Sequence, residues 1–514
     1  MRVLTAEEMR RAEKLAVEAG SSYEALMEQA GQGAASLLLS RERARLEKEG
    51  LTVLLGRGNN GGDGLVIARA VLEALPGARV RLIFCLGEAL SELAALNLAR
   101  LERFGGRVER YTAEDVPETA FSGVILDGIF GTGFHGGLPD GIRPVLQAAN
   151  RSEAVRIALD IPTGINGDNG LSDPDAFRAA GTYAFAALKP AHLFKSSRGL
   201  CGETEIIPIG ITGEMLAAAG GLIRMDKALV RDYLPPRTAD SHKGSYGKLM
   251  GIGGSGTMTG AVLLSMSGAA RCGVGLVMAA APEIAMQPVR MMLPEALQYP
   301  FPLGEDGLIA ADALPALLRK AADWPDAVLC GCGLGLGETG KALVKGLLAL
   351  GKPLVLDADG LGNLAKMGAG LLREAGGPVV LTPHMAEFSR LCGRTIPEIR
   401  ENRIDLARQF AREYRVTLVL KDSTTLVASP GGTVYLNDNG NSGLSRGGSG
   451  DTLAGMIASF LAQGAKPEEA AVCGVYLHAL AGDLAAAELT AYGMTITDVI
   501  RHIPGAFREV LGET

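Results

Sequence analysis

The residues best suited to chemistry lie in a glycine-rich stretch near the carboxyl end of the chain, RGGSGDTLAG (446–455). Its glycines lack Cβ atoms, so backbone N–H groups can converge on one point. An apolar helix expected over 452–461 would bring its positive end to the same place. The stretch therefore predicts an anion hole for a phosphate, with Asp451 placed to take a proton from a hydroxyl. The alternative is that Asp451 only caps the helix; the glycines and the upstream polar loops favour the catalytic interpretation.

Three further glycine-rich polar segments each follow an apolar strand in the first half: GRGNNGGDG (56–64), DGIFGTGFHGG (127–137) and DIPTGINGDNG (160–170). Ligands of parallel sheets bind beyond the carboxyl ends of the strands. Asn60, Asp127 and Thr163 would offer oxygen ligands there. Sites made only of oxygen suit alkali or alkaline-earth ions rather than zinc. The first segment is expected to be a turn before a helix over 65–72.

Other residues of these segments carry separate expectations. Asp160 is the candidate acid or base of the group. Asp127 and Asp160 could instead only cap loops, but their occurrence together with Asn-Asn-Gly-Gly-Asp favours a functional role. We expect Asp63 to stabilise the turn or the following helix start rather than to contact a ligand. Lys189 could orient a phosphate or be solvated, and His135 has no neighbouring acid and stays unassigned.

Apolar strands alternate with helical patterns along the chain, which predicts βαβ units and an α/β fold with parallel sheets. Expected strands in the first half lie at 52–55, 80–85, 123–126, 156–159, 182–188 and 205–209. A linker with a short helix follows over 211–221. Expected strands in the second half lie at 248–252, 275–280, 327–330, 353–356, 379–381 and 417–420. We place the boundary between two different folds near 212–224.

Composition narrows the function classes. The chain has 514 residues, 50 basic and 57 acidic side chains and a net charge of −7, without a long basic run, so nucleic acid is not the expected partner. The seven cysteines are scattered; we expect Cys330 and Cys332 to be small core residues, and the thiols to be reduced. No signal-peptide core and no charge-free run of membrane-spanning length is present. We expect a cytoplasmic protein without a membrane partner, and exposed apolar helices favour a homo-oligomer.

The stretch ending in Asp451 resembles the signature of the ribokinase-like superfamily, in which a GxGD motif forms the anion hole and its Asp is the catalytic base. The resemblance narrows to the NAD(P)H-hydrate dehydratase family through further motifs, in order: HKGSYGK (242–248), GGSGTMTGA (253–261), GCGLG (331–335), DADGL (357–361) and LTPHMAEF (381–388). These cover almost all of 225–514. In that family, ADP or ATP drives the removal of water from a hydrated nicotinamide cofactor. Phosphorylating the ring hydroxyl turns a poor leaving group into a good one.

The resemblance implies contacts for both ligands of the dehydratase. The hydrated cofactor would meet Ala261, Gly333, His384 and Asp451. The nucleotide would meet Lys421, Asp422, Ser423, Thr424, Thr425 and Gly450. Because bacterial relatives mostly use ADP, ADP with Mg²⁺ is the expected co-substrate. A lone histidine at a strand end is more often structural, but the residues that flank His384 favour a ligand contact.

This half departs from the family pattern at several positions. Family members usually have glycine where Ala386 and Asp422 stand, and a run of smaller residues where Leu444-Ser445-Arg446 stands. Asp422 would put a carboxylate near the nucleotide site.

The three segments of the first half resemble, in order, the loops of the NAD(P)H-hydrate epimerase family and cover about 1–212; Ala-Leu-Lys-Pro (187–190) also fits. The resemblance implies a Rossmann-like three-layer fold and potassium bound by Asn60, Asp127 and Thr163. It implies hydrate contacts at Asn59, Asn60, Gly61, Gly62, Asp63, Gly131, Thr132, Gly133, Phe134, His135, Gly136, Gly137 and Asp160. Asp160 would face the nicotinamide ring.

We therefore expect a bifunctional enzyme with an epimerase domain at 1–212 and a ribokinase-like dehydratase domain at 225–514. The first would interconvert the R and S hydrates of NADH and NADPH. The second would dehydrate the S form, converting ADP into AMP and phosphate. One alternative is a kinase of a small alcohol; the HKG motif and the epimerase-like half disfavour it. The other is that the first half is a non-catalytic dinucleotide-binding or protein-interaction module.

Overall fold

The computed structural model describes residues 1–512. It divides into two compact units, one of residues 2–222 and one that begins at Ile223 and includes Met1. The division follows the short helix α8 (Gly213–Ala219).

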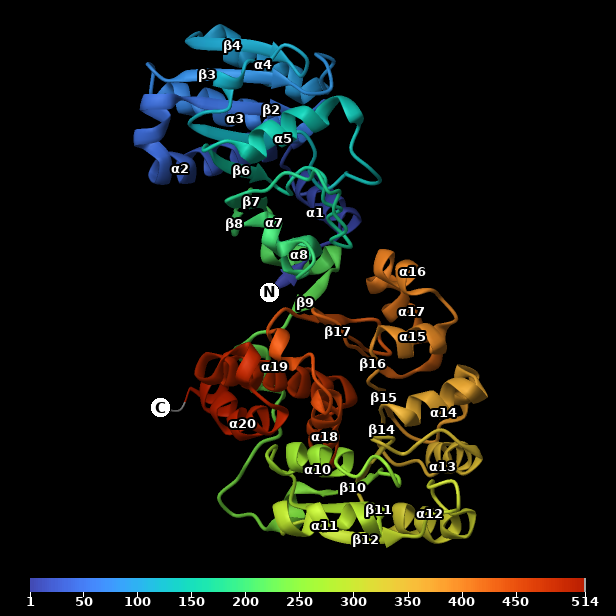
Figure 1. Cartoon of the computed structure of the whole chain (residues 1–514). Helices are drawn as coiled ribbons and strands as arrows, with labels where there is room; N and C mark the ends of the chain where they lie inside the picture. The colour runs from blue at the N-terminus through green and yellow to red at the C-terminus, as the bar shows by residue number, and fades with distance from the viewer. Residues whose placement is uncertain (513–514) are drawn as a thin grey trace. The chain divides into compact units, whose positions relative to one another are not determined.

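The sheet of the amino unit consists of seven strands, all parallel to their neighbours. From one edge to the other they are β4 (Arg107–Thr112), β3 (Arg79–Phe84), β2 (Leu51–Leu55), β5 (Val124–Gly128), β6 (Val155–Leu159), β7 (Gly181–Phe185) and β8 (Glu203–Ile207). The chain builds outward from β2 to one edge, returns to β5 and builds toward the other edge (Figure 1). The point where the order reverses, between β2 and β5, is where such folds bind ligands.

Helices cover both faces of this sheet. They are α1 (Ala6–Glu18), α2 (Tyr23–Glu49), α3 (Asn59–Ala74), α4 (Glu92–Phe104), α5 (Arg143–Arg151), α6 (Pro190–Leu193), α7 (Arg198–Cys201) and α8. Apolar residues of α2, α3 and α4 share one buried core with Val53 and Leu55, while those of α5 share another with Leu54 and Ile125. Side chains of a strand alternate between its two faces, so these cores lie on opposite sides of a three-layer, Rossmann-like unit.

The carboxyl unit holds a larger sheet. The sheet has eleven strands, of which β1 (Arg2–Val3) is one edge strand. The others are, in spatial order, β9 (Leu222–Arg224), β18 (Val434–Asn437), β17 (Thr425–Ala428), β16 (Thr417–Leu420), β15 (Val379–Leu381), β14 (Leu354–Leu356), β13 (Ala327–Cys330), β10 (Lys248–Ile252), β11 (Leu276–Pro282) and β12 (Leu297–Phe301). Strands β10 to β16 are parallel to one another, and β17 pairs antiparallel with both β16 and β18. The loops after β10, β13, β14, β15 and β16 therefore emerge at one edge, which is the edge that ligands of such sheets use.

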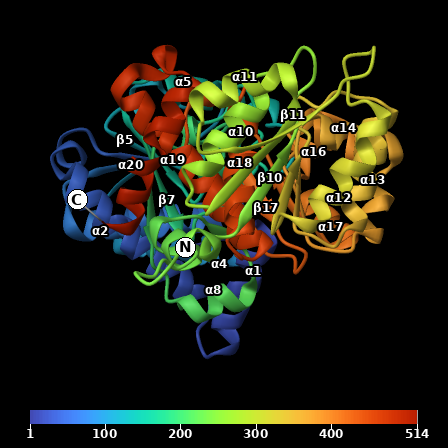
Figure 2. The same ribbon diagram turned by 90° about the horizontal axis from the view of Figure 1, so that it is seen from below.

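Helices also cover both faces of the carboxyl sheet. They are α9 (Lys227–Tyr233), α10 (Ala261–Ala270), α11 (Glu283–Met292), α12 (Leu314–Asp323), α13 (Glu338–Ala349), α14 (Asp359–Met367), α15 (Met385–Cys392), α16 (Ile396–Glu401), α17 (Arg403–Tyr414), α18 (Ser449–Ala462), α19 (Pro467–Gly493) and α20 (Ile496–Leu511). Figure 2 shows α10, α18, α19 and α20 on one side of the strands and α12, α13, α14 and α17 on the other. Within residues 1–512, only α19 is long and apolar enough to cross a membrane, but 72% of its apolar window is buried inside the protein, as in a core helix.

Candidate active sites

The first glycine-rich stretch begins a helix, which corrects the expectation of a turn over 56–64. Helix α3 starts at Asn59, so Asn60 and Asp63 lie in its first turns. A Cβ atom at Gly61 would lie 2.7 Å from the carbonyl oxygen of Gly56. Glycine lowers helix propensity, but here it lets the first turn of α3 approach the end of its own entry strand.

The three predicted cation ligands gather where β2, β5 and β6 end. Asn60 Nδ2 donates to the carbonyl oxygens of Phe130 and Leu159, at 2.9 and 3.1 Å. Asp127 accepts 2.7 Å hydrogen bonds from both the backbone N–H and the hydroxyl of Thr163. Asp127 is fully buried, and burial raises its pKa to about 6, although the hydrogen bonds from Thr163 lower it. No cationic side chain in residues 1–512 pairs with this carboxylate, so an oxygen-rich, buried acid is left without a positive partner.

Asp160 lies in a buried ion pair with Lys189. Its backbone has a positive φ of 63°, in the strained left-handed region, directly after β6. Lys189 Nζ donates to Asp160 Oδ1 and to the carbonyl oxygen of Phe185, the latter at 2.8 Å. The Lys189 side chain is fully buried, which excludes the solvated lysine that the sequence left open. The pair instead places the amine against the candidate acid or base.

A buried histidine fixes the backbone of this pair. His192 Nδ1 accepts from the N–H of Lys189 at 3.0 Å, and Nε2 lies 2.8 Å from the carbonyl oxygen of Asp160. Since Nδ1 is an acceptor, Nε2 must carry the proton and donate it. Burial, with Lys189 beside it, lowers the pKa of His192 to about 4, so the ring is neutral at physiological pH.

The second oxygen of Asp160 faces the loop after β5. A Cβ atom at Gly131 would lie 3.4 Å from Asp160 Oδ2 and 3.3 Å from Cγ of Asn60. Gly131 thus brings the loop close to both predicted site residues. Asp63 does not stabilise the helix start, contrary to the expectation, because α3 begins at Asn59 and has no side-chain cap bond. Asp63 is 8% exposed, and burial and then the charges of Asp160 and Glu13 raise its pKa well above the usual range.

The rest of this loop, from Thr132 to Gly137, is open in part. Cβ atoms at Gly133 or Gly136 would contact nothing within 4 Å. The Phe134 side chain is buried, with its ring 5.2 Å from that of Phe130, so only its backbone is available to a ligand. His135 Nδ1 lies 3.0 Å from Asn166 Nδ2.

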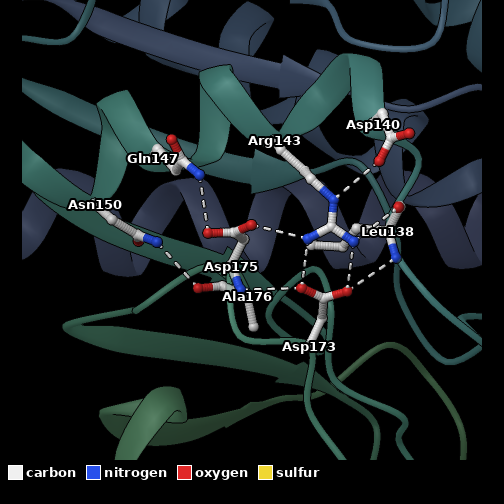
Figure 3. A network of polar contacts seen from close by, with 8 residues as sticks. All are labelled: Leu138, Asp140, Arg143, Gln147, Asn150, Asp173, Asp175 and Ala176. Carbon is white, nitrogen blue, oxygen red and sulfur yellow. Dashed lines mark hydrogen bonds and ion pairs between the residues drawn. The ribbon is translucent and has the colours of Figure 1, made fainter.

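Charged residues anchor the end of the same loop (Figure 3). Arg143 on α5 forms two hydrogen bonds with Asp173, at 2.8 and 3.0 Å, and one with Asp175 at 2.8 Å. Its guanidinium also donates to the carbonyl oxygen of Leu138 at 3.2 Å, and the Leu138 N–H donates to Asp173 at 3.2 Å. A planar guanidinium suits such paired bonds. We name this cluster of Leu138, Arg143, Asp173 and Asp175 the loop anchor.

In the carboxyl unit, Asp451 lies in the first turn of α18, whose N-cap Gly448 has a φ of 90°. The Cys332 sulfur and a carboxylate oxygen each of Asp357 and Asp451 lie within 4.8 Å of one another. Cys332 is buried as expected, but its thiol contacts Asp451 and so belongs to the site. Burial and then the charge of Asp357 raise the pKa of Asp451 to about 6, although Cys332 and Lys421 oppose the shift.

The predicted nucleotide loop (421–425) meets the glycine-rich turn. Lys421 Nζ donates to Asp357 Oδ1 at 2.8 Å, and a Cβ atom at Gly450 would lie 3.1 Å from the same Nζ. Burial would lower the pKa of Lys421, but the nearby carboxylates outweigh it, so that pKa is raised. Asp422 lies 3.7 Å from the buried Arg403, which partly neutralises its carboxylate. Ser423 is exposed and Thr424 is buried.

The predicted hydrate contacts lie on neighbouring elements. A Cβ atom at Gly333, where φ is 67°, would lie 3.0 Å from that of Ala261. His384 Nδ1 accepts from the N–H groups of Ala386 and Glu387, at 3.1 and 3.3 Å, and so caps α15. This leaves Nε2–H as a donor on a half-exposed ring, whose pKa is lowered by burial and then by Lys421. His384 therefore caps α15, and its Nε2 lies 3.5 Å from Oε1 of Glu387 on the same helix.

A cavity of about 690 Å³ opens beside Asp451. It is lined by Met258, Gly333, Leu336, Ala358, Asp359, Gly362, Ala365, Lys366, Glu387, Arg390 and Asp451. Its size is typical of a pocket for a small-molecule ligand.

Comparisons with known proteins agree over both units. Residues 249–505 match the family model described as NAD(P)H-hydrate dehydratase, and residues 23–191 match that of the YjeF-related protein N-terminus. The chain is 35% identical, over 526 residues, to the bifunctional NAD(P)H-hydrate repair enzyme of Moorella thermoacetica, with 99% of this chain and 97% of the relative covered. The chain belongs to the bifunctional NAD(P)H-hydrate repair enzymes. The Escherichia coli member of this repair family is 31% identical, with 96% of this chain and 92% of the relative covered.

One solved structure resembles the carboxyl unit of this repair-family chain. It is the ADP/ATP-dependent NAD(P)H-hydrate dehydratase of Bacillus subtilis, co-crystallised with ATP and Mg²⁺. It is 33% identical, with a TM-score of 0.50, and the match covers 56% of this chain and 99% of that one. The dehydratase fold expected for the second half is thereby confirmed.

For a repair enzyme with Asp451 as base, kcat/KM for dehydration should rise with pH through about 6 and level off above it. Below that value Asp451 carries a proton and cannot accept another; above it the carboxylate is free. The measurement is kcat/KM for the S hydrate from about pH 5 to about pH 8 at saturating nucleotide, because this ratio reports groups of the enzyme before it binds the hydrate. A profile that is flat across pH 6 would count against Asp451 as the base.

Proposed function

We propose that this chain repairs hydrated nicotinamide cofactors in two steps. The amino unit interconverts the R and S hydrates of NADH and NADPH, and the carboxyl unit dehydrates the S form with ADP or ATP. The observation that carries the proposal is the cluster of Asp451, Asp357 and Lys421 at the N-terminus of α18, beside a cavity of about 690 Å³.

In the dehydration, Asp451 accepts the proton of the ring hydroxyl as its oxygen attacks the terminal phosphoryl group of the nucleotide. The glycines before α18 and the helix N-terminus stabilise the charge on the transferred group. With ADP, AMP leaves. Phosphate then leaves with the C–O bond electrons, the neighbouring carbon loses a proton, and the ring double bond of NAD(P)H forms.

We assign Lys421 to Thr425 and Gly450 to the nucleotide, and Ala261, Gly333, His384 and Asp451 to the hydrate. The close approach of Gly450 to Lys421 supports the first set. We expect Mg²⁺ to accompany the nucleotide, because the carboxylate of Asp357 suits a hard cation beside phosphate oxygens and leaves Asp451 to accept the proton.

In the amino unit, Asp160 is the proposed acid or base at the hydroxylated carbon, and Lys189 holds its carboxylate in place. The open backbone around Gly133 and Gly136 provides room for the cofactor.

We further propose that Asn60, Asp127 and Thr163 hold potassium. The donor set is all oxygen, and the buried Asp127 lacks a cationic partner in residues 1–512. Bound potassium would supply a fixed positive charge near the phosphates of the cofactor. Epimerisation should therefore fall when K⁺ is replaced by the bulky tetramethylammonium ion, while dehydration of pure S hydrate should not. A K⁺ dependence that survives Asp127→Asn would contradict this assignment.

The whole proposal is tested by giving the purified chain a mixture of R and S hydrates and following the return of the nicotinamide absorbance. With ADP or ATP, both hydrates should be consumed; without nucleotide, neither should yield NAD(P)H. No signal from S hydrate with either nucleotide would remove the dehydratase function. Nucleotide-dependent phosphorylation of small alcohols instead would support the kinase alternative.

We propose a cytoplasmic homo-oligomer. All seven cysteines are free thiols, which suits a reducing compartment. Met291 and Met292 at the end of α11 are 83% and 62% exposed, which favours self-association.

A further inference from the structure

Two cationic side chains, Lys366 and Arg390, line the cavity beside Asp451 from the adjacent helices α14 and α15. Both are exposed, and neither belongs to any ion pair within residues 1–512. Neither residue is among the ligand contacts that the sequence predicts. Two cations on one cavity wall without anionic partners are a marker of an anion-binding site.

The acidic residues of the same wall are already engaged. Asp359 accepts a 2.8 Å hydrogen bond from the N–H of Gly335, and Glu387 accepts one of 2.8 Å from the N–H of His384. Each carboxylate is thus committed to a backbone donor, while both cations are available. Within residues 1–512 neither carboxylate forms an ion pair with Lys366 or Arg390, so both cations can pair with an anion that enters the cavity.

The shape of the wall leaves room for an elongated ligand. Ala358, Gly362 and Ala365 line the cavity at spacings of four and three residues, along one face of α14. They carry small side chains or none, so α14 itself projects little into the cavity between Asp451 and Lys366, although the Leu336 side chain lies against Gly362.

The position of the cavity identifies the ligand that would place its anion there. Gly333 and Asp451, which we assign to the hydrate, line it, whereas residues 421–425, assigned to the nucleotide, do not. The hydrated cofactor carries a pyrophosphate, and the NADP form also carries a 2′-phosphate.

We infer that Lys366 and Arg390 form the phosphate-binding part of the hydrate site in the dehydratase unit. This inference rests on the proposed function of Asp451. The cations bind phosphate oxygens of the dinucleotide and hold it with its ring hydroxyl toward Asp451. They touch no reacting atom, so their contribution appears in substrate binding rather than in the chemical step.

The test compares Lys366→Gln, Arg390→Gln and the double variant with matched controls on other helices. Lys345 on α13 and Arg319 on α12 are exposed and do not line the cavity, so Lys345→Gln and Arg319→Gln remove the same charge elsewhere. Steady-state rates are measured with pure S hydrates of NADH and of NADPH at saturating ADP. Each cavity variant should raise KM for hydrate by about fivefold to tenfold, with kcat nearly unchanged. KM for ADP and both controls should remain at wild-type values.

The two hydrates separate the two phosphate sources. An equal rise in KM for both places the pyrophosphate on these cations; a rise confined to the NADPH hydrate places the 2′-phosphate there. An unchanged KM for both hydrates, or a rise in KM for ADP alone, would overturn the inference. If the wild type turned over neither hydrate, the proposed function would fail instead. In that case, equal NADPH affinity of the wild type and the double variant would overturn the phosphate site, and weaker binding by the variant would uphold it.

Discussion

Replacement of Asp451 by Asn should abolish nucleotide-dependent dehydration while epimerisation continues at the wild-type rate. Asn has nearly the same shape but cannot accept the hydroxyl proton, so the step loses its base. Loss of a positioned general base typically costs a factor of about 10² to 10⁴. The readout is NAD(P)H absorbance from S hydrate with saturating ADP, together with R-to-S conversion followed by chromatography.

The control is Asp312→Asn, which removes one carboxylate from the surface of the same unit. It should leave both activities intact. Dehydration by Asp451→Asn within tenfold of wild type would show that another group accepts the proton. Loss of both activities would point to misfolding, which thermal denaturation would detect.

The second large effect is expected at the buried pair of Asp160 and Lys189. Asp160→Asn removes the proposed acid or base, so R-to-S conversion should fall by about 10² or more. It also leaves the ammonium of Lys189 buried without a counter-charge, and breaking a buried pair in this way costs about 3–5 kcal/mol. The melting temperature of the amino unit should therefore fall as well, while dehydration of S hydrate persists.

A double variant separates catalysis from stability. Asp160→Asn with Lys189→Met removes the orphaned charge and fills its space with an apolar side chain. It should regain most of the lost stability but stay inactive as an epimerase. If it recovered R-to-S conversion, or if Asp160→Asn never lost it, the amino unit would be a binding module without catalysis through Asp160.

Buried strands were predictable because they are continuous apolar runs. The expected ranges 248–252 and 417–420 are those of β10 and β16. The strands that the sequence did not reveal include β4 and β12, which lie at sheet edges and are largely exposed. Edge strands lack one buried neighbour, so their apolar pattern is interrupted, by charged residues in β4 and by Gln298 and Pro300 in β12.

Helix starts within glycine-rich stretches were not predictable from propensity. Helix α3 begins at Asn59 although glycines follow, because tertiary packing overrides a weak local preference. The expected strand over 182–188 ends at Phe185 instead, since Ala186 takes a φ of 60° and turns the chain toward Lys189.

Motif spacing identified candidate site residues at strand ends, but it did not identify the residues of other helices and strands that interact with them. Glu13 comes from α1; burial and then the charge of Asp160 raise its pKa, and its own charge helps to raise the pKa of Asp63. Asp357 stood within a predicted motif, yet its pairing with Lys421 depends on β14 and β16 ending at the same edge. Such contacts follow from the topology and have no signature in local sequence.

The loop anchor lowers the conformational entropy that the amino unit loses when a ligand binds. Arg143, Asp173 and Asp175 hold the segment that ends at Leu138 through charge-assisted hydrogen bonds within the unit itself. A loop that is already ordered loses little conformational entropy when a dinucleotide arrives, so more of the contact energy appears as affinity. These ion pairs, remote from any reacting atom, thus make the glycine loop a rigid receptor and not one that must fold around its ligand.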